Sequence, residues 1–178
     1  LLQAQAGTDP HDPFSTAPVT DLDSPLEQAD LGSIRAMITP DLGSAAMSHA
    51  YSSIFADRTS RFRHHFAAAI DASPDFTDGD NCFEVLRGVN FVAAHGRRVR
   101  DHRDSLSPNV VDNVDRGLAY SLADVAEAHL QQSRIARAWL DLFEDIDVVI
   151  CPAASSTPFP HDQWSVSEID GETMETYM

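Results

Sequence analysis

The chain has 178 residues, of which 43% are hydrophobic and 22% charged, as expected for one globular domain of ordinary size. Its formal net charge is −16, from 28 acidic and 12 basic side chains, and every base is an arginine. Such a surface repels phosphates, so no nucleic-acid partner is expected. No apolar run reaches the roughly 18 residues that a membrane span needs, so no membrane association is expected.

Cysteine usage and the chain ends suggest a cytoplasmic segment of a longer protein. Cys82 and Cys151 show neither metal-ligand spacing nor a disulfide framework, and no secretory signal is visible. The predicted location is therefore the reducing cytoplasm. Residues 1–7 have the pattern of the last turns of a helix closed by Gly7. Since no initiator methionine precedes them, we interpret the chain as an internal segment.

The first half predicts a polar connection, a strand and a helix, in that order. Residues 8–32 are rich in Pro, Asp, Ser and Thr, which favours surface turns. Residues 33–39 predict a strand that ends at Pro40, before a turn at 41–43. Apolar residues then recur mostly at helical spacing, which predicts a helix over 48–70.

Three helices are predicted next, with a short fourth possible between the first two. The first runs from about 81 to 95, with Gly96 as a weak point or an end, and a short exposed helix could follow over 97–106. The second begins at Pro108, which suits the first helical position, with Ser107 as its N-cap. The third spans 121 to about 145 and opens with a capping-box pattern at Ser121 and Asp124.

The last helix carries a predicted apolar stripe and leads into a buried strand. The stripe consists of Leu122, Val125, Ala126, Ala136, Trp139, Leu140 and Phe143. Residues 147–151 then form a short β-branched run that ends at Pro152, which is typical of a strand buried on both faces. Helix, tight connection and buried strand predict the α/β class. The loop 153–160 would follow the carboxyl end of that strand, where ligands gather in open α/β sheets.

Residue chemistry alone assigns no reaction. The eight histidines show no metal-binding pattern, and adjacent His64 and His65 would point in different directions on a helix. Cys151 with His161 could form a nucleophile and base, but nothing in the sequence demands it. A cysteine that closes a buried strand is usually a small core residue, and a pocket wall is the simpler role for Cys151. Residues 155–157 lack the turn of a serine nucleophile. These patterns predict an acidic α/β domain and no more.

A series of segments resembles the amidase signature family. The clearest is Asp147 to Ala153, an aspartate followed by an apolar strand and Cys-Pro. Others share the family's order and approximate spacing over nearly the whole chain: residues 1–15, 34–43, 83–91, 108–118, 159–162 and 169–172. On these residues the chain is similar to the C-terminal half of an amidase. Residues 1–178 are therefore expected to be a single partial domain, truncated at both ends.

The resemblance implies part of a mixed central β-sheet covered by helices, and hydrolysis of the C–N bond of a small-molecule amide. The family uses a Ser-Ser-Lys triad, with a Gly-Ser-rich loop as oxyanion hole. This chain has no lysine and no such loop, so it receives no catalytic residue and is expected to be inactive alone. The resemblance assigns Cys151, Pro152, Ala154 and Phe159 to the acyl pocket. It implies no cofactor or metal, and a homodimer is compatible with it.

Two other functions stay open at this point. One is the amidase-like component of a glutamine-dependent amidotransferase, which passes ammonia from glutamine to a charged tRNA together with partner subunits. The strong negative charge argues against direct tRNA contact. The other is a non-catalytic acidic α/β interaction domain. A lysine and a Ser-Ser loop encoded upstream of Leu1 would separate the enzymes from the interaction domain.

Overall fold

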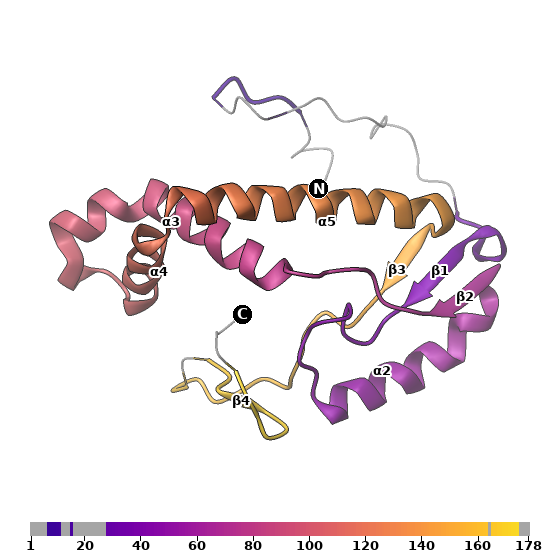
Figure 1. The fold of residues 1–178 in the computed structure, drawn as a ribbon. Coiled ribbons are helices and arrows are strands. Elements are labelled where there is room, and N and C mark those ends of the chain that lie inside the picture. Colours follow the sequence, from indigo (N-terminus) through magenta and orange to yellow (C-terminus); the bar gives the residue numbers. More distant parts are fainter. Residues whose placement is uncertain (1–6, 12–14, 16–27, 164, 175–178) are drawn as a thin grey trace. The chain divides into compact units, whose positions relative to one another are not determined.

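The computed structural model describes residues 7–11, 15, 28–163 and 165–174. It divides into two compact units, Leu1–Asp30 and Leu31–Met178 (Figure 1). In the first unit, the Asp9 carboxylate accepts the backbone N–H of His11 at 2.8 Å. The hydrogen bonds from His11 hold the pKa of Asp9 below its usual value. Residues 1–6 of the predicted helix end and most of the polar connection lie outside the described residues, whereas Gly7 is described and has a φ angle of 143°.

Three parallel strands form the sheet of the second unit, in the order β2-β1-β3 (Figure 1). The strands are β1 (Arg35–Ile38), β2 (Ala68–Asp71) and β3 (Val148–Ile150), and a 3-10 turn, Leu31–Ser33, precedes β1. The central strand β1 is the most buried, as Ala36, Met37 and Ile38 show. Because helices connect the parallel strands, the predicted α/β class is confirmed.

The helix predicted over 48–70 is shorter in the structure, where α2 spans His49–Phe62. It starts where expected, and in the structure Ser48 is its N-cap. Beyond it the prediction is wrong, because Phe66 precedes β2 and Ile70 belongs to it. A short apolar run is compatible with both a helix and a strand. Here the run forms the strand β2, because it pairs with β1.

The outer edge of β2 is shielded by Arg63, from the 3-10 turn Arg63–His65 that precedes it. The Arg63 guanidinium donates to the Ala69 carbonyl at 3.1 Å and to the Asp71 carboxylate at 2.7 Å. The hydrogen bond with Asp71 raises the pKa of Arg63. A charged side chain laid over strand carbonyls blocks edge-to-edge pairing, so this edge of the sheet is protected.

A single long helix, α3 (Gly79–His102), replaces the two segments predicted around Gly96. The sequence predicted a helix over 81–95, weakened or ended at Gly96, and a separate exposed one beyond it. One glycine in a helix costs only about 1 kcal/mol relative to alanine. The burial of Val85 and Val99, on either side of Gly96, offsets that cost, so the helix continues.

The helix α4 (Pro108–Ala119) packs against α3 through a pair of glycines. Pro108 takes its first position and Ser107 caps it, as predicted. At the contact, a Cβ built on Gly117 would lie 2.3 Å from the carbonyl oxygen of Gly88. The two backbones therefore touch, which no larger residue would permit.

A 3-10 turn, Arg103–Ser105, follows α3, and an ion pair ties it to α4. The Arg103 guanidinium binds both carboxylate oxygens of Asp115, through a first hydrogen bond of 3.1 Å and a second, shorter one. The contact lowers the pKa of Asp115. Together with the glycine contact, it sets the angle between the two helices.

The helix α5 (Leu122–Asp145) begins with the predicted capping box. The Ser121 hydroxyl accepts the N–H of Asp124 at 3.2 Å, and the Asp124 carboxylate accepts the N–H of Ser121 at 2.7 Å. These hydrogen bonds lower the pKa of Asp124. Aspartate thus fills the role that glutamate or glutamine usually takes at this position.

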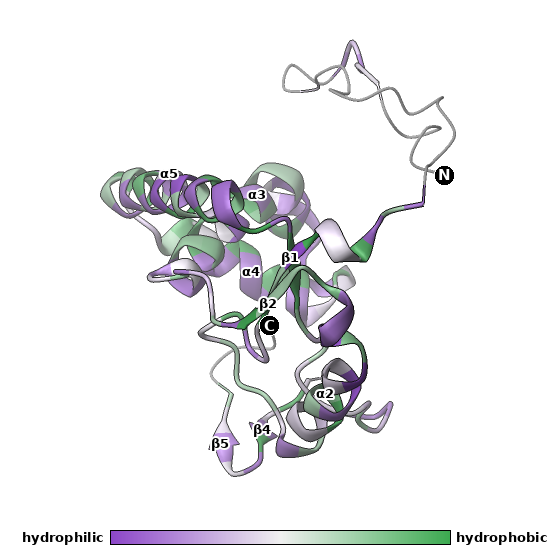
Figure 2. Ribbon diagram, turned by 90° about the vertical axis from the view of Figure 1, so that its right-hand side faces the viewer, coloured by the Kyte–Doolittle hydropathy of each residue, from purple (hydrophilic) through white to green (hydrophobic). Residues whose placement is uncertain are grey.

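The buried face of α5 differs from the predicted apolar stripe. Ala128 and Gln131 are its buried residues, whereas Leu122, which the stripe included, is 86% exposed. The Cys82 thiol of α3 donates to the Ala128 carbonyl at 3.3 Å, and Asn81 donates to Gln131 at 3.0 Å. Small and polar side chains therefore define this contact, and Figure 2 shows hydrophobic and hydrophilic residues interleaved along α5.

The strand β3 follows α5 as predicted, but its residues are half-buried and not buried on both faces. It is an edge strand: among the described residues, only β1 pairs with it. In the part of the chain that the structure describes, no helix has the length and apolar character needed to cross a bilayer.

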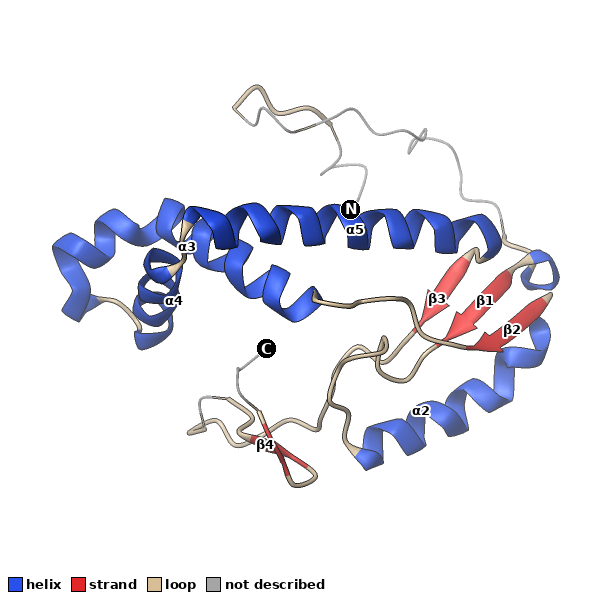
Figure 3. Ribbon diagram, viewed as in Figure 1, coloured by secondary structure: helices blue, strands red, loops and turns tan. Residues whose placement is uncertain are grey.

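A small antiparallel hairpin follows β3 after a long loop (Figure 3). Its strands are β4 (Glu168–Ile169) and β5 (Glu172–Thr173). The two turn residues, Asp170 and Gly171, have φ angles of 49° and 94°. This left-handed geometry is that of a two-residue type I′ turn, for which Asp-Gly is a favoured sequence.

Candidate functional site

The carboxyl ends of the three parallel strands meet at one edge of the sheet, and a proline follows each strand within three residues. Pro40 follows β1, Pro74 follows β2 and Pro152 follows β3. Because proline lacks the N–H that a strand ladder needs, pairing stops there and three loops diverge. This is the edge at which ligands gather in open α/β sheets.

Thr39, the residue after β1, holds these loops together. Its backbone N–H donates to the Ile150 carbonyl of β3 at 3.0 Å. Its hydroxyl lies 3.0 Å from the Ser73 hydroxyl, which follows β2. Thr39 is fully buried, so water does not compete for these hydrogen bonds. The three loops therefore start from one fixed point.

The loop after β1 turns sharply at Asp41, as predicted. The Asp41 carboxylate accepts the N–H of Gly43 at 2.7 Å. Leu42 and Gly43 both have positive φ angles, 53° and 87°. A Cβ on Gly43 would lie 3.1 Å from the Pro74 carbonyl oxygen, so glycine also allows the loop after β2 to approach. The turn directs residues 44–46 into the wall of a cavity.

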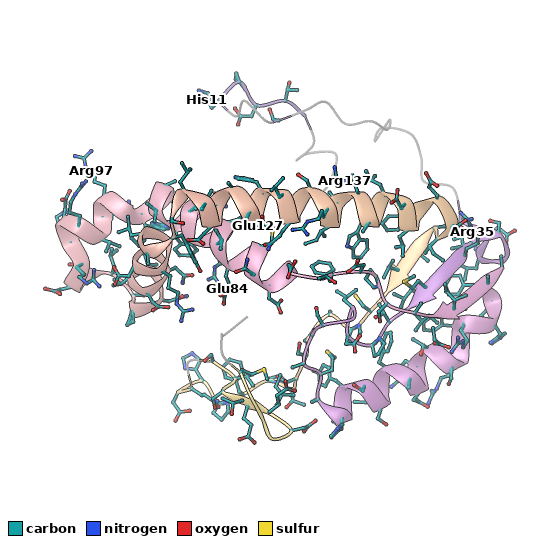
Figure 4. All side chains as sticks on the ribbon, in the orientation of Figure 1. His11, Arg35, Glu84, Arg97, Glu127 and Arg137 are labelled. Carbon is teal, nitrogen blue, oxygen red and sulfur yellow. The ribbon has the colours of Figure 1, made fainter. Side chains whose placement is uncertain are left out.

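This cavity has a volume of about 1130 Å³, and the loops that follow β1 and β3 contribute residues to its lining. One wall is formed by α3 and α4, and the opposite wall by the C-terminal segment from Ser155 to Met174; residues 44–46 complete it. Figure 4 shows Glu84 on the side of α3 that faces this segment. The cavity is large enough for a small organic ligand.

Charged side chains on the helical wall are paired along α4. Arg116 lies 3.0 Å from the Asp112 carboxylate, one helical turn away. Burial raises the pKa of Tyr120, the nearby Glu84 carboxylate adds to the rise, and Arg116 opposes it. The Tyr120 hydroxyl therefore stays neutral at physiological pH and can donate or accept a hydrogen bond to a ligand.

Arg87 stands between two aromatic rings on the same wall. Its guanidinium carbon lies 5.9 Å from the ring centre of Phe83 and 5.2 Å from that of Phe91. Both distances are in the range of cation–π attraction, which orients the guanidinium. The wall thus combines aromatic surface with oriented polar groups, an arrangement that suits a ligand with an apolar body and a polar end.

Of the four residues predicted for the acyl pocket, Phe159 lines the cavity. Cys151, Pro152 and Ala154 belong to the same loop, nearer to β3, and do not line it. The loop is anchored where the Ser155 carbonyl accepts the N–H of Ser48 at 2.8 Å. The structure therefore brings Phe159 to the cavity, and contact of the other three with a substrate stays a prediction.

The two cysteines differ in environment. Cys151 is exposed, so its interpretation as a small core residue is wrong; the loop leaves the sheet immediately after β3. Cys82 is buried against α5, and burial raises the pKa of its thiol. A raised pKa keeps this thiol protonated and unreactive, so Cys82 serves packing.

The structure differs from the prediction that His64 and His65 lie on a helix and point in different directions. His64 and His65 lie in the 3-10 turn before β2, and their ring centres are 4.0 Å apart. The two rings therefore lie against each other, tilted by 40°, and do not point in different directions. The described residues contain no cluster of three or more His, Cys, Asp or Glu side chains that could hold a metal ion.

Sequence reasoning missed two features of the cavity. The spacing of Phe83, Arg87 and Phe91 at every fourth residue places them on one face of a helix, a signal that was available. The dipeptide Asp170-Gly171 is likewise a strong hairpin signal. The approach of this hairpin to α2 and of α4 to α3 depends on tertiary packing, which no local pattern reveals.

The chain is similar in fold to two solved amidases, although no family model and no curated protein matches its sequence. A bacterial aryl acylamidase of the amidase signature family superposes with a TM-score of 0.76 and 16% identity, over 95% of this chain and 37% of that enzyme. Another amidase superposes with a TM-score of 0.70 and 16% identity, over 84% of this chain and 34% of the enzyme. The predicted amidase signature fold is therefore confirmed. The chain spans little more than a third of either enzyme.

Proposed function

We propose that this chain forms one part of an amidase, an enzyme that hydrolyses the C–N bond of a carboxylic amide. The observation that carries the proposal is the superposition of 95% of the chain on an aryl acylamidase at a TM-score of 0.76. The cavity supports it, because residues of the loops that leave the carboxyl edge of the sheet after β1 and β3 line it, and substrates of α/β enzymes bind on that side of the sheet.

The chemistry of amide cleavage requires groups that this chain does not provide. In a Ser-Ser-Lys mechanism, a serine attacks the carbonyl carbon, and the proton it loses passes through the second serine to lysine. The sequence contains no lysine, so the base must come from polypeptide outside these 178 residues. The role of this chain is then to complete the scaffold and the walls of the substrate pocket.

Phe159 is the residue that we expect to contact the acyl group. It lines the cavity and is 45% exposed, so its ring has apolar surface available for a ligand. Cys151, Pro152 and Ala154 would shape the same pocket closer to the sheet, where the catalytic groups of the remaining polypeptide are expected. Burial of an aromatic ring against an acyl chain stabilises substrate without taking part in proton transfer.

The test is amide hydrolysis by the chain assembled with the polypeptide that supplies the lysine, using an acyl nitroanilide as substrate. Phe159→Ala is expected to raise KM about tenfold with little change in kcat, since partial loss of a ring contact costs roughly 1–2 kcal/mol of uniform binding. The matched control is Phe143→Ala, because Phe143 is also 45% exposed but lies on α5 away from the cavity lining.

Two results would count against the proposal. One is the lack of amide turnover in every assembly that contains a lysine base and a folded chain. The other is a KM for the Phe159→Ala enzyme equal to that of the Phe143→Ala control, which would remove the cavity from the substrate path.

A further inference from the structure

The β4–β5 hairpin forms much of the cavity wall opposite α3 and α4. Ile169, Glu172, Thr173 and Met174 all line the cavity. The hairpin is a self-contained piece: its strands pair with each other, and the Met174 N–H donates to the Ser167 carbonyl at 2.9 Å. Its type I′ turn matches the natural twist of paired strands, so we expect it to move as one body.

The hairpin is attached to the rest of its unit at few points. It packs only sparsely against the helices and the parallel sheet. Ile169 is its one buried hydrophobic residue among those described, at 8% exposure. The preceding residues 157–163 are exposed and form neither helix nor strand. Residues 157–163, which follow the anchor at Ser155, can therefore serve as a hinge.

A polar contact between described residues holds the turn of the hairpin in place. The Asp170 carboxylate accepts the backbone N–H of His49, the first residue of α2, at 2.5 Å. The same carboxylate oxygen lies 3.3 Å from His49 Nδ1. A carboxylate at a helix N-terminus is stabilised by the unpaired N–H groups of the first turn. The side chain of Asp170 is 39% exposed and that of His49 is 91% exposed. The contact is therefore weak and can break.

From these observations we infer that the β4–β5 hairpin is a movable wall of the cavity, and that Asp170 is the latch that holds it closed against α2. Opening breaks the contact between Asp170 and His49, exposes Ile169 and widens access to the helical wall. The inference goes beyond the proposed function, because it concerns motion and requires no turnover.

The test is hydrogen–deuterium exchange of the purified chain, read by mass spectrometry. Asp170→Asn keeps a residue that tolerates the left-handed turn but removes the charge from the latch. Exchange in residues 165–174 is expected to become about tenfold faster, the order expected for loss of one charge-assisted hydrogen bond. Peptides from α3 serve as the internal reference. The control, Asp162→Asn, changes an exposed aspartate in the same segment and should behave as wild type.

A second variant removes the other partner of the latch. His49→Pro deletes the donating N–H at the first helical position, where proline is well tolerated, and Ser48 already has the extended backbone that precedes proline, with ψ of 142°. It should accelerate hairpin exchange as much as Asp170→Asn, and the double variant should exchange no faster than either single one, since both break one contact.

Three outcomes would overturn the inference. The first is wild-type exchange of the hairpin in Asp170→Asn or in His49→Pro. The second is rapid exchange of the hairpin in the wild-type chain while α3 is protected. The third is complete exchange throughout the wild-type chain, because the wall that the latch closes would then have no stable structure.

Discussion

The two walls of the cavity are built in opposite ways. The α3–α4 wall rests on direct backbone contact between Gly88 and Gly117, and Val114 of α4 is fully buried. Among the described residues, the hairpin wall rests on the buried Ile169 and on the partly exposed carboxylate contact of Asp170. The difference indicates a division of roles: the helical wall sets the shape of the cavity, and the hairpin wall sets access to it.

The helical wall cannot adjust without separating its helices. A Cβ on Gly117 would meet backbone atoms of Gly88 and also the Val92 side chain at 2.7 Å, so small displacements of side chains would not relieve the clash. The hairpin has the reverse property, since its contact with the first residue of α2 can break while the hydrogen bonds within that helix remain. Substitutions in the helical wall should therefore lower the folding stability, whereas substitutions in the hairpin wall should increase the motion of the hairpin.

The largest expected effect tests the rigid wall. Gly117→Ala should lower the free energy of unfolding by about 3 kcal/mol, because overpacking against backbone outweighs the better helix propensity of alanine. The matched control is Gly96→Ala in α3, where the nearest atom to a new Cβ is 3.6 Å away. This control should raise stability by up to about 1 kcal/mol. Urea unfolding measures both; equal stabilities would show that the glycine contact does not define the wall.

A smaller effect is expected at the end of the sheet away from the cavity, where Figure 4 shows Arg35. There Arg35 binds Asp147. The Asp147 carboxylate accepts the Arg35 backbone N–H at 2.7 Å and its guanidinium at 3.0 and 3.1 Å. These hydrogen bonds lower the pKa of Asp147 to about 2. Both side chains are about two-fifths exposed, so the stabilisation is modest.

The lowered pKa fixes the sign of the pH dependence. The ion pair stabilises the folded chain at pH values above the unfolded pKa, about 4, and its contribution is lost as pH falls from about 4 to 2. Asp147→Asn should therefore be less stable than wild type at pH 7, and the gap should close toward pH 2. Thermal unfolding at both pH values measures this difference in stability. The other aspartates with lowered pKa values are present in both proteins, so their contributions cancel in the comparison. A gap that is constant with pH would contradict the assignment.

The features that the sequence predicted correctly are those that depend on interactions between neighbouring residues. The caps at Ser107 and Ser121, the strand before Pro40 and the turn at Asp41 were all expected and all occur. Each depends on a few neighbouring residues, whose hydrogen bonds or backbone limits act within one turn of chain.

Features that depend on packing between distant parts of the chain could not be predicted from the sequence. Contacts with other elements determine three such features. They are the end of α2 before Phe66, the continuity of α3 through Gly96, and the burial of the face of α5 that carries Ala128. The candidate site is similar: the resemblance pointed to Phe159, whereas the approach of the hairpin to α2 through Asp170 required the folded chain.

The most direct test of the account uses the lack of lysine in this chain. The chain and the polypeptide that completes it are acetylated separately with an amine-selective ester, recombined with untreated partner, and assayed for acyl nitroanilide hydrolysis. Acetylating this chain should leave activity unchanged, whereas acetylating the other polypeptide should abolish it. Hydrolysis with turnover by this chain alone, or full activity after acetylation of its partner, would contradict the account.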